Sequence, residues 1–89
     1  METLAQKQMR FTHMVGKLIQ WAYEHGYTLT FGDAYRDHRV TYGHHRSLHR
    51  VRLAVDLNLF RDGKWLQKTE DHQPLGEYWE SIGGVRRIS

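Results

Sequence analysis

The stretch from Val51 to Leu59 most constrains how this chain can fold. Valine and leucine occupy every second position in it, at Val51, Leu53, Val55, Leu57 and Leu59. This period of two predicts a β-strand with one buried face. Asp56 has the opposite parity, so we expect its carboxylate to project from the face that the core residues leave.

Apolar residues spaced three and four positions apart predict an N-terminal helix over residues 4–25, with Gly26 as its stop. Residues 27–35 alternate and are rich in β-formers, which predicts a strand. Residues 36–50 are polar and basic, and we expect them to form a loop.

After the central strand, Asp62-Gly63 predicts a hairpin turn into a return strand that begins at Trp65. Pro74 suits the first turn of a second helix, which ends at Gly83-Gly84. Residues 85–89 are expected to be a short basic tail. The predicted fold class is therefore α+β, a small antiparallel sheet packed by an N-terminal helix and a C-terminal helix.

The length of 89 residues fits a single domain spanning 1–89, and an apolar fraction of 39% fits a folded chain. The absence of cysteine excludes disulfides and thiolate metal sites. The chain shows neither an apolar run long enough to span a membrane nor a secretory signal. Its net charge of +3 suits an anionic partner such as nucleic acid or cell wall.

His49 and Asp56 form a candidate metal site. His49 precedes Asp56 by seven positions, at the end of the polar segment, where it can fold over the face that carries the acid. An imidazole and a carboxylate that converge are two ligands of the kind that zinc binds, and Ser47 can support them by hydrogen bonding. This spacing is not a unique signature, and a plain ion pair or hydrogen bond between His49 and Asp56 is the alternative.

The pattern Ser47-x-His49-x₄-Ala54-x-Asp56 resembles the SxHxxGxAxD signature of a family of zinc peptidases that cut D-alanine-containing cell-wall peptides. This family includes the VanY-like D-alanyl-D-alanine carboxypeptidases and the phage L-alanyl-D-glutamate endolysins. The resemblance covers most of the chain from about residue 10. Its further blocks are GDAYRD (32–37), YGHHRSLHRVRLAVDLNLF (42–60) and PLGEYWESIGG (74–84).

The resemblance implies a role for four residues. His49 and Asp56 match the first two zinc ligands, and Ser47 matches the serine that supports the site. Arg36 matches a basic residue expected to hold a carboxylate of the substrate peptide. Without the resemblance, Arg36 is more simply interpreted as a solvated loop cation.

Two departures from the family pattern affect the expected activity. Arg52 stands where the signature usually has glycine. The family also continues beyond PLGEYW to an acid, which is the general base, and to a closing histidine, which is the third zinc ligand. Here residues 83–89 read GGVRRIS, so we expect this chain to lack both, and to hold zinc weakly.

Other residues are candidates for a third ligand or a base, although no spacing argument places them at the site. The histidines are His44, His45 and His72, and the carboxylates are Glu70, Asp71, Glu77 and Glu80.

The expected function is therefore that of a phage-type zinc peptidase-like protein of peptidoglycan peptide hydrolysis, inactive if the third ligand and base are absent. Before any release it would lie in the cytoplasm of the host cell. The alternative is a catalytically dead phage-encoded binding protein or inhibitor that acts on a host protein of a defence or cell-wall system. A third interpretation, nucleic-acid binding through the basic segment, is disfavoured because no nucleic-acid-binding module is recognisable.

Overall fold

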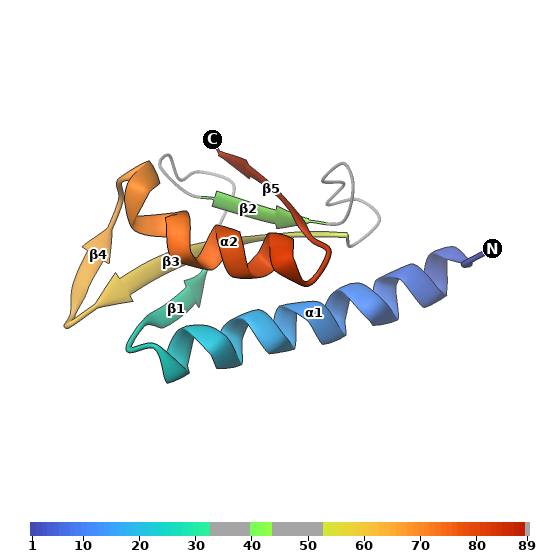
Figure 1. Ribbon diagram of the computed structural model, residues 1–89, viewed down its shortest axis with the longest axis horizontal. Coiled ribbons are helices and arrows are strands. Elements are labelled where there is room, and N and C mark those ends of the chain that lie inside the picture. Colours follow the sequence, from blue (N-terminus) through green and yellow to red (C-terminus); the bar gives the residue numbers. More distant parts are fainter. Residues whose placement is uncertain (33–39, 44–52, 89) are drawn as a thin grey trace.

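The computed structural model describes residues 1–32, 40–43 and 53–88, and it shows an α+β arrangement of two helices against an antiparallel sheet (Figure 1). Strand β3 (Ala54–Arg61) is the central strand. Strand β1 (Thr28–Phe31) pairs with one edge of β3. Strands β2 (Val40–Gly43) and β4 (Lys64–Leu66) pair with the other edge. The predicted fold class is confirmed.

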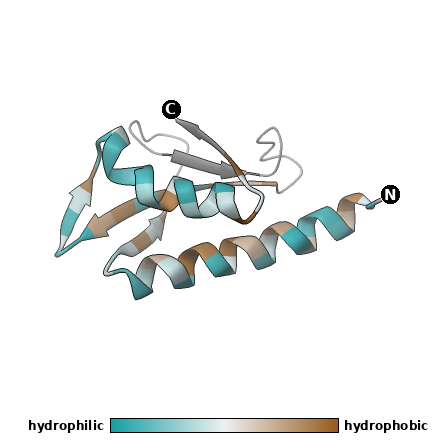
Figure 2. Cartoon of the chain, in the orientation of Figure 1, coloured by the Kyte–Doolittle hydropathy of each residue, from teal (hydrophilic) through white to brown (hydrophobic). Residues whose placement is uncertain are grey.

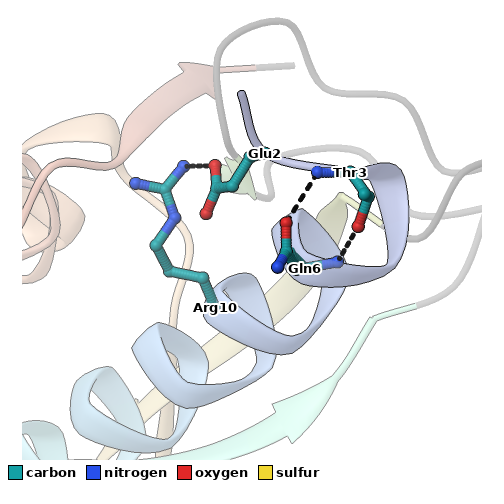
Figure 3. Close-up of polar contacts among 4 residues, drawn as sticks. All are labelled: Glu2, Thr3, Gln6 and Arg10. Atoms are coloured by element: carbon teal, nitrogen blue, oxygen red, sulfur yellow. Dashed lines mark hydrogen bonds and ion pairs between the residues drawn. The ribbon is translucent and has the colours of Figure 1, made fainter.

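Helix α1 (Leu4–Glu24) begins at a capping box (Figure 3). The Gln6 N–H donates to Oγ1 of Thr3 at 3.1 Å, and the Thr3 N–H donates to Oε1 of Gln6 at 2.9 Å. Two backbone donors that a helix start leaves without partners are thereby satisfied. Arg10 adds an ion pair with Glu2 at 2.8 Å.

The end of α1 confirms Gly26 as the predicted stop. Gly26 has φ 87°, a left-handed conformation that glycine adopts without a steric penalty. The turn is then fixed from β3, because the Arg61 guanidinium donates to the His25 carbonyl at 2.6 Å and lies 3.9 Å over the Tyr27 ring. The strand predicted over 27–35 begins at Thr28 and ends at Phe31, and its residues 33–35 lie outside the described part.

Two short strands correct the expectations for residues 36–50 and 85–89. Strand β2 lies within the predicted loop, and strand β5 (Val85–Ile88) replaces the predicted basic tail. They pair with each other, and β2 also pairs with β3, which gives the order β1-β3-β2-β5. Each is four residues long and is held by partners distant in sequence, so its local pattern is a weak predictor.

The connection from β3 to the second helix contains the predicted hairpin turn. Asp62 and Gly63 have φ 55° and 76°, as a type I′ turn requires. A 3-10 helix, η2 (Thr69–His72), then precedes helix α2 (Gln73–Ser81), which has Pro74 in its first turn. The sequence pattern gave no sign of η2.

The core lies between the helices and one face of the sheet. Figure 2 shows hydrophobic bands alternating with hydrophilic ones along α1, as a one-sided apolar stripe does. The Trp79 ring of α2 is fully buried and meets Phe11 of α1 edge to face at 5.8 Å. The buried apolar residues are Phe11, Met14, Leu18, Ala22, Tyr27, Leu53, Leu57, Leu59, Leu75 and Trp79.

Trp79 also holds the start of β5 in place. Its Nε1 donates to the Val85 carbonyl at 3.0 Å, and the Gly84 N–H donates to the Trp79 carbonyl at 2.9 Å. A Cβ on Gly84 would overlap with Nε1 and Cε2 of the indole, which has no room to move. Glycine at position 84 is therefore required by the packing of α2 against β5.

We expect Gly84→Ala to lower the free energy of unfolding by about 3 kcal/mol, because an added methyl group overpacks a buried ring. Urea denaturation followed by tryptophan fluorescence measures this loss. Gly16→Ala is the matched control: Gly16 is exposed in the middle of α1 with no neighbour within 4 Å of an added Cβ. We expect that change to stabilise the chain by about 0.5–1 kcal/mol. Equal stability of the Gly84→Ala and wild-type chains would contradict the packing described.

Candidate metal and substrate site

Asp56 lies in the middle of β3 and is only 8% exposed. Its sequence neighbour Leu57 is 1% exposed and belongs to the core, so the acid projects from the opposite face of the sheet, as its parity predicts. The strand is paired on both sides at this point: Thr41 of β2 is the Cα partner of Asp56, and the Gly32 N–H donates to the Asp56 carbonyl at 2.8 Å.

The burial of Asp56 is a finding that parity alone did not predict. A carboxylate removed from water is costly unless hydrogen-bond donors or a cation compensate it. A valine or threonine would suit this position of a strand better by propensity. Because the Asp56 side chain is only 8% exposed in the centre of the sheet, it is expected to have a polar or charged partner there.

Asn58 extends the polar character of this face. It has the parity of Asp56, and its Nδ2 donates to Oγ1 of Thr30 on β1 at 3.3 Å. Its Oδ1 is buried, and no hydrogen-bond partner for that atom exists within the described part of the chain. Sequence analysis missed Asn58, although its parity with Asp56 was a signal that could have drawn attention to it.

The other predicted site residues lie outside the described ranges. These are the candidate ligand His49, the supporting Ser47 and the candidate substrate-binding Arg36. Gly43 and Ala54 are Cα partners at the paired ends of β2 and β3, and residues 44–53 connect them. Of the predicted zinc ligands, the structure therefore places Asp56 alone.

Among the alternative third ligands, His72 is the one histidine that falls in a described segment. It is 2% exposed, and its Nε2 lies 3.3 Å from the Leu66 carbonyl. Because a carbonyl oxygen only accepts, Nε2 is the donor in this contact. His44 and His45 lie outside the described residues.

The spare carboxylates are distributed over η2 and α2. Asp71 accepts from the Lys68 N–H at 3.2 Å, and Glu77 accepts from Nε2 of Gln73 at 2.8 Å. Glu70 and Glu80 are exposed. Within residues 1–32, 40–43 and 53–88, no three His, Asp or Glu side chains are grouped so that they could hold a metal ion.

Comparisons of the chain with models of known protein families, with curated proteins and with solved structures found no match. In the segments that the structure describes, no helix is both long enough and apolar enough to cross a membrane.

We expect Asn58→Val to leave the free energy of unfolding unchanged or to raise it by up to about 1 kcal/mol, because it removes a buried acceptor and adds a strong β-former. Thr30→Val is the matched control, since it removes the acceptor of the same hydrogen bond and leaves the Asn58 amide donor without it. That change should cost about 1 kcal/mol. Urea denaturation measures both, and a cost above about 1 kcal/mol for Asn58→Val would mean that its amide has a partner in the folded chain.

Proposed function

We propose that this chain is a phage-type zinc peptidase-like protein of bacterial cell-wall hydrolysis, with His49 and Asp56 as two zinc ligands. Ser47 supports these ligands, and Arg36 holds a carboxylate of the peptidoglycan peptide. The proposal is supported most by Asp56, a buried acid on the face of the sheet that the core does not use.

The chain length between the two ligands is compatible with this proposal. His49 is five residues before Ala54, and five residues of extended chain span at most about 18 Å. Asp56 lies two residues inside β3, which is about 7 Å from Ala54 along the strand. A carboxylate paired with a neutral imidazole is a donor set that zinc accepts, and zinc bound by it would polarise a peptide carbonyl.

A complete catalytic site needs a third protein ligand and a base that takes a proton from water. Among the described residues, no group of three His, Asp or Glu side chains could hold a metal ion. The activity proposed for His49, Asp56 and Arg36 is therefore weak zinc binding together with binding of the peptide.

The zinc part of the proposal is tested by equilibrium dialysis of the chain against zinc. We expect about one zinc ion per wild-type chain at saturation, and an affinity more than about tenfold lower for His49→Ala and for Asp56→Asn, since each removes a ligand. Ser47→Ala should weaken binding by about tenfold through loss of support. His13→Ala, which removes an exposed histidine of α1, is the matched control and should bind as the wild type does. If all four variants bound zinc with the same affinity, the proposal of a zinc site at His49 and Asp56 would be contradicted.

The substrate part is tested with a synthetic stem peptide in a fluorescence titration. We expect Arg36→Ala to weaken peptide binding by about tenfold or more, because a charge-assisted bidentate contact is lost. Lys17→Ala on the exposed side of α1 is the matched control for charge. Muropeptide digestion in the presence of zinc, measured in parallel, tests whether the bound peptide is also cut. Capture of a host protein that survives His49→Ala and Asp56→Asn, together with no peptide binding, would favour the inhibitor alternative instead.

A further inference from the structure

The face of the sheet opposite the helices carries a row of side chains along β3. Asp56, Asn58 and Phe60 share one parity, and successive members of this row are about 7 Å apart along the strand. Leu57 and Leu59 have the other parity and belong to the core. The row therefore continues from the candidate metal ligand Asp56 along the same face.

Trp65 of β4 extends this row at its apolar end. It is the Cα partner of Phe60, and directly opposed residues of an antiparallel pair project from the same face. Trp65 is 39% exposed, and Phe60 is half-buried. Their neighbours of opposite parity face the helices, since Leu59 belongs to the core and Leu66 packs against it. We refer to Asp56, Asn58, Phe60 and Trp65 as the outer strip.

Asn58, in the middle of the outer strip, has an acceptor to which no group in the described part of the chain donates. Its Nδ2 donates to Oγ1 of Thr30 at 3.3 Å, and its Oδ1 is buried without a hydrogen-bond partner there. A buried carbonyl without a donor is costly and rare in folded proteins. Zinc is bound by imidazole, thiolate and carboxylate groups, so the uncharged amide oxygen is matched better by an N–H donor.

The spacing of the outer strip matches that of an extended peptide. In an extended chain every second backbone N–H points the same way, which gives a repeat of about 7 Å, the same as the repeat along β3. The strip also changes from a buried acid at one end to two aromatic rings at the other. Exposed aromatic rings supply much of the contact energy of binding surfaces.

We infer that the peptide of the proposed function lies extended along the outer strip, from Asp56 toward Trp65. The inference rests on the proposed function, which places the zinc ion at Asp56. Oδ1 of Asn58 accepts one backbone N–H of the peptide, and an apolar side chain of the peptide packs on Phe60 and Trp65. From Asp56 to Phe60 is about 13 Å, so the strip takes peptides of four or more residues with an apolar group far from the zinc-bound end.

The apolar end is tested by fluorescence anisotropy of a labelled stem peptide, with EDTA present so that binding is measured without zinc. We expect Trp65→Thr to weaken binding by about tenfold, because it removes the exposed ring and keeps a β-former in β4. Phe31→Thr is the matched control, since Phe31 is 70% exposed on the helix-covered face, and it should bind as the wild type does. Circular dichroism checks that each variant is folded.

The N–H contact is tested with ester analogues of the same peptide, in which oxygen replaces one backbone N–H at a time. We expect one ester to bind the wild type about tenfold more weakly than the amide does. Asn58→Val should bind that ester and the amide equally, because the acceptor is gone. Thr30→Val leaves Oδ1 in place and should keep the preference for the amide.

The outcomes separate this inference from the proposed function. Binding that Arg36→Ala weakens, but that Trp65→Thr and Asn58→Val leave unchanged, would overturn the outer strip and leave the proposed function standing. Binding weakened by the strip variants and not by Arg36→Ala would support the strip and contradict the contact proposed for Arg36. Absence of peptide binding by the wild type would overturn both.

Discussion

Strand β3 is hydrogen-bonded along both of its edges, and the other parts of the structure depend on this arrangement. Its odd-numbered leucines, Leu57 and Leu59, are buried beneath α1 and α2. Its other face carries Asp56 and Asn58. Because a shift of one residue in a strand exchanges its faces, the buried leucines also fix the side on which the acid lies. Core packing and the position of the candidate site are thus set by the same alternation.

The elements with a strong local signal were predictable. The alternation in β3, the apolar stripe of α1, the Gly26 stop and the Asp62-Gly63 turn each depend on residues close in sequence. Strands β2 and β5 were not predicted, because each is only four residues long and they pair with each other across more than forty positions of the chain. Gly43 looked like a loop residue, but it is the last residue of β2 and, like the rest of that strand, is paired with both β3 and β5.

The candidate site was predictable in part. The parity of Asp56 gave its face correctly, since alternation is a property of the backbone. Its low exposure depends on the paired strands at each side and on what covers the sheet, which no local pattern encodes. The parity of Asn58 with Asp56 could be read from the sequence, but its hydrogen bond to Thr30 on β1 could not, because those two residues are 28 positions apart.

Residues 85–88, expected to be a basic tail, have a structural role that their composition did not indicate. Residues that looked like a solvated basic end form β5 and are anchored to α2 through Trp79, Gly84 and Val85. Strand β5 begins directly after Gly84 and lies on the far side of β2 from β3, the strand that carries Asp56.

The central claim is that His49 and Asp56 meet at one zinc ion. A zinc titration followed by NMR of the ¹⁵N-labelled chain tests it most directly, because imidazole nitrogens and backbone amides are observed in the same sample. The account predicts that one ring nitrogen of His49 and the β3 amides around Asp56 shift together with a single saturation curve. Shifts confined to other histidines, with the β3 amides unchanged, would contradict it.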